Sequence, residues 1–546
     1  MKFNPITAFA SSILGFILLS CEKAQMADLI VHHAGIYTVN DNFEQAEAFA
    51  IKDGRFIAVG TNSEILEQFK SDSVLDLDGS FLYPGFIDAH AHFYGYGTGL
   101  QMADLTGLAS FDELVETVRI HREKFPDQPW ILGRGWDQNL WEGKEFPKKD
   151  TLDHLFPNTP ILLTRIDGHA ALANQAALDL GEINASTSIS GGKVILDMGL
   201  PTGVLIDNAI QNVSTRIPAM GESEVNKALL IAQQNCFKVG LTTVADAGLD
   251  RYEIEQIEKL QLEGSLKMRI YAMVNPTPSN KTHYFEKGPS QHDRLTVMSF
   301  KIYGDGALGS RGAALLSPYH DSPDEQGFLL SSVEELEGLA KDIYQQGFQM
   351  NTHCIGDSTN RILLDIYSKV LKGKNNRRWR IEHAQVVHRE DIEKFAKYQI
   401  IPSVQPTHAT SDMYWAEERL GPERIRDAYT YKNLLDQNGI IALGSDFPVE
   451  SINPMYGFHA AVARKDVKNW PENGFQPESK LTREEALKGM TIWAAYANFE
   501  EKLKGSIEPG KFADFVILDK DIMKIPEEEL REVEVSSTYI GGEKVY

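Results

Sequence analysis

Two histidines close an apolar run in the segment PGFIDAHAH. On a β-strand, residues i and i+2 point to the same side, so His90 and His92 can both reach one cation. Ala89 and Ala91 would then pack on the opposite side of the strand. Imidazole nitrogen is a preferred ligand of zinc and its first-row neighbours. The pattern favours a metal site, and the alternative is a buried strand whose two histidines serve packing.

Four further polar residues stand at the ends of strand-like segments downstream. His353 and His383 are 30 residues apart, which matches one β–α unit. His383 and Asp446 are 63 residues apart, which matches two such units. Any one of these residues alone could serve structure. Six polar side chains meeting at one end of a barrel would be costly to bury without cations. The candidates are Lys301, His353, His383 and Asp446, in addition to His90 and His92.

The elements that must position these side chains alternate strand-like runs with helical patterns from about residue 84 to 500, which is typical of an α/β fold. Eight strand candidates occur, the number that a closed parallel (β/α)8 TIM-type barrel requires. A doubly wound open sheet is the alternative. Closure is favoured because polar residues follow the strand ends, where barrel enzymes place their chemistry. After the first strand, which contains the two histidines, the others are predicted at 241–246, 268–274, 297–302, 348–353, 379–383, 400–404 and 440–446.

The barrel is predicted to span 84–504, with other structure around it. Short alternating strands over 27–83 and 505–546 predict a small composite β-sandwich domain built from both chain ends. An insertion at about 105–235 follows the first strand and is far longer than one connecting helix. We expect it to lie over the active-site face as a lid, and a subdomain packed to one side is the alternative.

The overall composition is that of a large globular protein, with 546 residues of which 42% are hydrophobic. There are 54 basic and 77 acidic residues, and the net charge of -23 argues against nucleic acid or an anionic membrane surface as a partner. Besides Cys21, the chain contains only Cys236 and Cys354, so no disulfide framework is expected.

The first 20 residues have the pattern of a secretory signal. A single charge, Lys2, precedes an apolar segment from about residue 6 to 19, which is too short to span a bilayer comfortably. The segment ends in LLSC, which resembles the lipobox of bacterial lipoproteins, so cleavage would leave a lipidated Cys21. We then expect the protein in the cell envelope, anchored to a bacterial membrane on its periplasmic or surface side. A plain signal peptide is the alternative.

The motifs in the barrel region resemble those of the amidohydrolase superfamily. The likeness is greatest to its third branch of metal-dependent hydrolases, which includes N-substituted formamide deformylase. It rests on the PGFIDAHAH block, the GSDFP block that contains Asp446, and the GSIEPGKFAD block near the C-terminus. It extends over essentially everything after the signal. The resemblance implies a barrel hydrolase that acts on a C–N bond.

The resemblance also implies a binuclear centre, with zinc as the expected metal. His90, His92 and Asp446 would hold the more buried ion. His353 and His383 would hold the more exposed ion.

Lys301 would be carboxylated and bridge the two ions, because an unmodified ammonium group offers only hydrogen-bond donors. Burial among histidines would lower the pKa of this amine and free it to take up CO2. If Lys301 stays unmodified, we expect one ion, zinc or iron.

The implied reaction is the hydrolysis of an amide, an N-substituted formamide or a cyclic amide by metal-activated hydroxide, with Asp446 as general base and then general acid. His169, in the segment DGHAALAN, and Arg311, in GSRG, are candidate substrate contacts. Packing for His169 and a surface ion pair for Arg311 are the alternatives. An inactive metal-binding or assembly scaffold, and an isomerase or decarboxylase on the same barrel, are the alternative functions. A homodimer is left open.

Replacing Cys21 with alanine is expected to release the protein from the membrane, since the mutant has no thiol to acylate. In a bacterial host supplied with labelled fatty acid, the wild type should take up label and fractionate with membranes. The Cys21→Ala variant should remain unlabelled and move to the soluble fraction. Unchanged partitioning of the variant would contradict the anchor.

Overall fold

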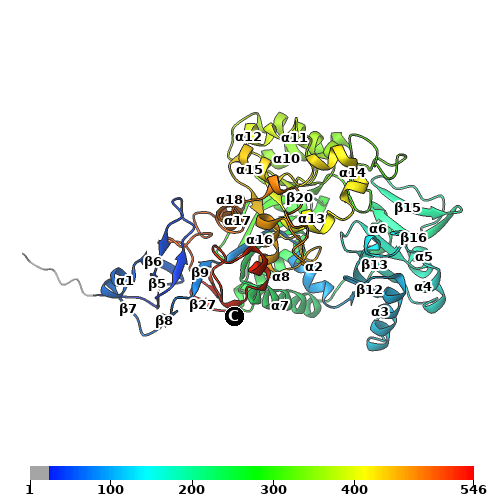
Figure 1. The fold of residues 1–546 in the computed structure, drawn as a ribbon. Coiled ribbons are helices and arrows are strands. Elements are labelled where there is room, and N and C mark those ends of the chain that lie inside the picture. The colour runs from blue at the N-terminus through cyan, green and yellow to red at the C-terminus, as the bar shows by residue number, and fades with distance from the viewer. Residues whose placement is uncertain (1–23) are drawn as a thin grey trace, which may run out of the picture.

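A computed structural model describes residues 24–546, and the predicted signal over 1–20 and Cys21 lie outside these described residues. The centre of the molecule is a (β/α)8 TIM-type barrel of parallel strands, as predicted, and the doubly wound alternative is wrong (Figure 1). Each predicted strand is present. In hydrogen-bonded order they are β10 (Phe86–Ala91), β17 (Leu241–Leu249), β18 (Arg269–Val274), β20 (Leu295–Tyr303), β21 (Gln349–Cys354), β22 (Arg380–His383), β23 (Ile401–Val404) and β24 (Ala442–Leu443).

The barrel closes between its first strand and the segment that follows its last. The backbone N–H of Asp446 donates to the carbonyl oxygen of His90 at 2.8 Å. The N–H of His92 donates to a carbonyl oxygen just beyond Asp446, also at 2.8 Å. The buried carboxylate of Asp88 accepts a hydrogen bond from the hydroxyl of Ser445 at 2.6 Å. The segments that close the barrel are therefore the ones that carry three of the candidate ligands.

Helices cover the outside of the barrel (Figure 1). In α10 (Val333–Gln345), Ser332 and Glu335 form a capping box, and Leu336, Ala340 and Ile343 are buried along one face. Within residues 24–546, no helix is long and apolar enough to cross a bilayer. The other helices of this region are α2 (Phe93–Gly99), α7 (Glu222–Lys238), α8 (Arg251–Leu262), α9 (Pro278–Lys287), α11 (Asp357–Leu371), α12 (Glu393–Tyr398), α13 (Pro406–Asp412), α14 (Ala416–Arg424), α15 (Tyr431–Asn438), α16 (Pro454–Ala463), α17 (Arg483–Gly489) and α18 (Ile492–Ala497).

Strands from both ends of the chain form a small β domain at one side of the barrel (Figure 1). The central pairing joins the two ends, with Leu82 of β9 opposite Ile517 of β25. Phe49 packs edge-on against Phe56 and Phe515 in the core of this domain. One sheet is β6 (Arg55–Gly60), β5 (Ala48–Lys52), β2 (Leu29–His32) and β8 (Val74–Asp76). The other is β27 (Glu543–Lys544), β26 (Val535–Ile540), β25 (Phe515–Leu518), β9 (Phe81–Pro84), β3 (Gly35–Tyr37) and β4 (Gln45–Ala46).

Gly85 connects the β domain to the barrel. Its N–H donates to the carbonyl oxygen of Asp514 at 2.9 Å. A Cβ atom at this position would lie 2.4 Å from the hydroxyl oxygen of Thr242, so only glycine allows β9 to continue directly into β10.

The long connection after β10 forms its own mixed sheet at the opposite side of the barrel from the β domain (Figure 1). It contacts the barrel through an ion pair of 2.8 Å between Lys144 and Glu418. Although the prediction extended this insertion to about residue 235, α7 packs on β17 as a barrel helix. In sheet order the strands are β11 (Ala103–Asp104), β12 (Ile131–Trp136), β13 (Ile161–Arg165), β14 (Ala170–Ala173), β16 (Leu200–Asp207) and β15 (Gly192–Asp197), with helices α3 (Phe111–Lys124), α4 (Asp150–Leu155), α5 (Gln175–Leu180) and α6 (Asn208–Ser214).

Replacing Gly444 with alanine is expected to destabilise the barrel closure. The new Cβ would lie 2.6 Å from the backbone nitrogen of His90 and 2.7 Å from Asp88 Oδ1. We expect a loss of roughly 1–3 kcal/mol in the free energy of unfolding, measured by urea denaturation. Gly338 on α10 has no neighbour within 4 Å of the corresponding position, so Gly338→Ala should be neutral or stabilising. Equal effects of the two substitutions would contradict close packing at Gly444.

Candidate metal centre

Three side chains from the two closing segments form a first group of possible ligands: His90, His92 and Asp446. Nε2 of His92 lies 3.1 Å from Asp446 Oδ1, and Nε2 of His90 lies 3.6 Å from the same oxygen. His90 and Asp446 are buried, and His92 is partly exposed. The structure thus brings together the three residues that the sequence suggested for one ion.

A second group shares Asp446 and adds His383 and His408. Nε2 of His408 lies 3.4 Å from Asp446 Oδ2, so the two oxygens of one carboxylate face different histidines. The sequence analysis missed His408, which lies in α13, four residues beyond β23. The signal was the histidine in QPTH, just past the strand predicted at 400–404.

Outer hydrogen bonds fix the orientation of three of these rings. Nδ1 of His92 lies 2.9 Å from the carbonyl oxygen of Ala247, and Nδ1 of His90 lies 2.6 Å from the buried carboxylate of Glu382. Nδ1 of His383 lies 2.7 Å from Oε1 of a buried glutamine, Gln405. Because Nδ1 is engaged in each case, Nε2 is the ring nitrogen that faces the candidate metal position. Metal-binding histidines are held in this way in proteins.

The centre also contains a buried oxygen without a hydrogen-bond partner. Within residues 24–546, Asp446 Oδ1 receives no hydrogen bond although it is buried. His383 and Asp446 both adopt left-handed backbone conformations, with φ of 71° and 62°. Such strain persists where the surrounding structure enforces it, as at functional sites. An oxygen of this kind among histidine nitrogens fits a divalent cation.

The protonation states of His353, His383 and Asp446 suit metal binding. By contrast, burial would lower the pKa of His408, but the carboxylates of Asp446 and Glu450 raise it to about 10. Burial lowers the pKa of His353 and His383 well below the usual value, which keeps both imidazoles neutral. Burial alone would raise the pKa of Asp446, but the imidazoles of His408 and His92 beside its two oxygens hold the pKa well below its usual value. Neutral imidazoles and an ionised carboxylate are the forms that bind a metal.

Lys301 and His353 join the cluster in different ways. Nζ of Lys301 lies 2.9 Å from Nε2 of His90, and burial lowers the pKa of this amine to about 8. The ring of His353 lies 4.5 Å from that of His383, measured between centroids, but His353 belongs to neither ligand group. Its buried Nε2 has no hydrogen-bond partner in the described part of the chain.

Most of the cluster, including His92, His383 and Asp446, lines a cavity of about 1040 Å³. The insertion supplies part of the wall, including Asp137, Arg165 and His169. The ring of His169 lies 4.8 Å from that of His353, and its Nδ1 lies 2.6 Å from the carboxylate of Asp207. The insertion therefore contributes part of the wall of the cavity that holds the candidate ligands.

Arg311 takes a different position from the substrate contact that the sequence suggested. Its guanidinium forms an ion pair of 2.8 Å with Asp321, and it is not among the residues that line the cavity. The structure thus favours the alternative, an ion pair outside the site. A short sequence motif cannot separate these roles, because both place an arginine in a loop after the Lys301 strand.

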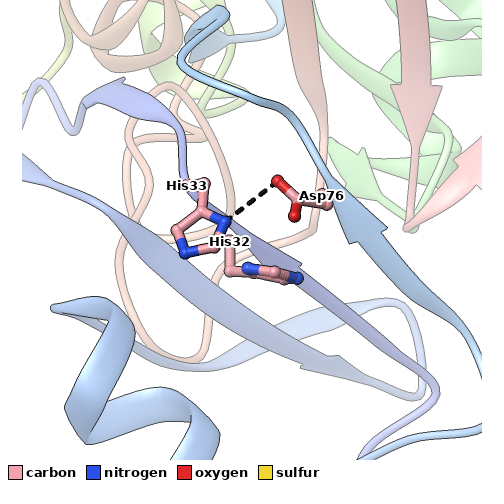
Figure 2. Close-up of side chains that lie close together, drawn as sticks. All are labelled: His32, His33 and Asp76. Carbon is pink, nitrogen blue, oxygen red and sulfur yellow. Dashed lines mark hydrogen bonds and ion pairs between the residues drawn. The ribbon is translucent and has the colours of Figure 1, made fainter.

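One further group of possible ligands lies outside the barrel, in the β domain (Figure 2). His32 and His33 are neighbours at the end of β2, and Nδ1 of His33 lies 3.0 Å from Asp76 Oδ1. The side chains of His33 and Asp76 are both about half exposed. An exposed ion pair accounts for this arrangement, and the cluster shares no residue with the cavity.

The chain matches the model of the amidohydrolase family over residues 73–546. The chain belongs to this family. YtcJ of Bacillus subtilis, named as a putative amidohydrolase, is 32% identical over 95% of this chain and 99% of its own length. The N-substituted formamide deformylase of Arthrobacter pascens is 29% identical over 95% and 98%. A crystal structure of a metal-dependent hydrolase from Pyrococcus horikoshii OT3 has a TM-score of 0.75, with 26% identity over 91% of this chain and 99% of that one.

Membership of the amidohydrolase family and these likenesses support a metal-dependent hydrolase. The two groups of histidine and aspartate side chains are the candidate metal-binding sites of this amidohydrolase.

Replacing Glu382 with glutamine is expected to weaken metal binding without removing a ligand. Glu382 holds Nδ1 of His90, and loss of such an outer partner typically costs 10–100-fold in affinity. Competition with a chromogenic chelator measures the zinc affinity directly. Glu500→Gln is the matched control, because this buried glutamate binds Thr296 and Lys504 instead. Equal zinc affinity in the two variants would count against the role of Glu382.

Proposed function

We propose that this amidohydrolase hydrolyses the C–N bond of an amide, an N-substituted formamide or a cyclic amide, with Asp446 as general base and general acid. The observation that carries the proposal is the position of Asp446, which lines the cavity and whose two oxygens face the two histidine groups. The family assignment supports hydrolysis, and the relative named as an N-substituted formamide deformylase supports the formamide as one substrate class.

The ligand groups suggest which residues would hold the metal. His90, His92 and Asp446 are proposed to hold one ion. His383 is proposed for a second ion, with His353 or His408 as its histidine partner. When bound, divalent cations at this position would lower the pKa of a water molecule and polarise the carbonyl group of the substrate. Zinc is the expected metal because the nitrogen-rich donor set suits it.

Lys301 is proposed to carry a carbamate. Its neutral amine would attack CO2 and lose a proton, giving an anionic group with two oxygen atoms. The lowered pKa and the place of Nζ beside His90 support this modification. If the amine stays unmodified, the proposal reduces to a single ion.

Asp446 is proposed to move the proton that the reaction requires. One carboxylate oxygen accepts a proton from the attacking water, whose oxygen forms the new bond to the carbonyl carbon. The carboxyl group of Asp446 then delivers this proton to the leaving nitrogen as the C–N bond breaks. His169 reaches the cavity from the insertion and is proposed to contact the substrate, with its ring held by Asp207.

We also propose that the protein is exported and lipid-anchored at Cys21 in the cell envelope. This part of the proposal rests on the LLSC segment alone.

Replacing Asp446 with asparagine is expected to reduce kcat by roughly 10²–10⁴-fold, because the amide side chain cannot carry the proton. A panel of amides, formamides and cyclic amides gives the rates, and metal analysis of the same samples shows whether the ions remain. Asp365→Asn, which affects an exposed ion pair with Lys394 outside the cavity, is the control and should keep wild-type rates. A kcat close to that of the wild type in Asp446→Asn would contradict the proposed role.

A further inference from the structure

Large apolar side chains are exposed around the mouth of the cavity. Leu140, Tyr414 and Val467 line the cavity and are 56%, 53% and 65% exposed. Trp470 is 52% exposed and stacks on Tyr414, with 5.4 Å between ring centroids and 14° between ring planes. We refer to Tyr414, Val467 and Trp470 as the mouth platform. The platform comes from the barrel, whereas Leu140 comes from the insertion.

One buried carboxylate holds the mouth platform in place. Asp466 accepts hydrogen bonds of 2.8 Å from the backbone N–H groups of Lys468 and Trp470. The hydroxyl group of Tyr414 donates to the other oxygen of Asp466. The N–H of Asp466 in turn donates to the carbonyl oxygen of Trp470 at 2.8 Å. Asp466 therefore holds the backbone at Trp470 and the hydroxyl group of Tyr414, and the two rings stack on each other. A ligand that stacks on rings positioned in this way loses little side-chain entropy.

The position of the mouth platform points to the ligand that covers it. Exposed apolar patches on soluble proteins mark binding sites more often than ordinary surface. Two platform residues, Tyr414 and Val467, line the same cavity as His383 and Asp446, so the platform is continuous with the reaction site. The cavity volume of about 1040 Å³ is far larger than an amide group needs and matches the upper range for ligands of drug size.

We propose that the substrate carries an aromatic or extended apolar group, beyond its scissile C–N bond, that binds on the mouth platform. This inference rests on the proposed hydrolysis of an amide-type bond and names the substrate class. Asp466 is a positioning residue in this account, because it acts through Tyr414 and Trp470. A surface for a protein partner or for a second copy of the chain is the competing use of the same residues.

Binding of a fluorescent amide tests the platform without turnover when the protein and each platform variant also carry Asp446→Asn. The probe is N-(2-naphthylmethyl)acetamide, and its fluorescence anisotropy is titrated with the protein. Tyr414→Ala and Trp470→Ala are expected to weaken binding by about tenfold, from the loss of ring contact area and aromatic stacking. Trp470→Phe should recover most of the affinity. Leu262→Ala is the control, since Leu262 is an equally apolar and more exposed side chain, 84%, outside the cavity.

Hydrolysis of a matched pair of amides gives the second measurement. N-methylacetamide has the same scissile bond as the probe but lacks the naphthyl ring. The ratio of kcat/KM for the naphthyl amide to that for the methyl amide is expected to fall about tenfold in Trp470→Ala and to stay constant in Leu262→Ala. If neither amide is hydrolysed, this result counts against the proposed hydrolysis of such amides. The anisotropy titration still shows whether an aromatic group binds on the mouth platform.

Three results would overturn the inference. The first is that the naphthyl probe does not bind the wild type. The second is that Trp470→Ala binds the probe as tightly as the wild type does. The third is that Trp470→Ala converts an oligomer to a monomer in sedimentation while probe binding stays unchanged. The surface would then be an interface between copies of the chain.

Discussion

The buried carboxylate of Asp446 is the constraint on which the rest of the barrel end depends. An ionised group in such a place is costly unless hydrogen bonds or cations surround it, and here histidines approach both of its oxygens. Its backbone N–H at the same time closes the barrel onto the strand of His90. The same segments thus close the barrel and position the candidate ligands, so a change that loosens the closure also displaces the ligands.

Much of this arrangement follows from the sequence, because parallel strands impose simple rules. His90 and His92 share one face through the two-residue period of a strand. Lys301 lies near the end of β20, His383 ends β22 and Asp446 follows β24. A closed parallel barrel brings the carboxyl ends of all its strands to one rim. These rules depend only on the order and spacing of strands, so they require no knowledge of loop conformation.

The remaining parts of the site depend on contacts that spacing does not encode. His408 lies within a helix after its strand, and its approach to Asp446 depends on how that helix packs. Glu382 occupies an ordinary strand position, and only the three-dimensional register shows that it holds His90. The ion pair of Arg311 with Asp321 likewise joins loop residues. The mouth platform depends on tertiary packing in the same way, since Tyr414 and Trp470 are far apart in sequence.

Different parts of the chain contribute different features of the candidate site. The barrel supplies the ligands, the insertion adds His169 to the cavity wall, and the cavity mouth offers apolar surface to a substrate. The proposed hydrolysis requires a cation among the histidines. Anomalous X-ray scattering from a crystal of the zinc-loaded protein, collected on both sides of the zinc absorption edge, tests that requirement most directly. The account predicts a strong peak between His90, His92 and Asp446, and a map without a peak at this position would contradict it.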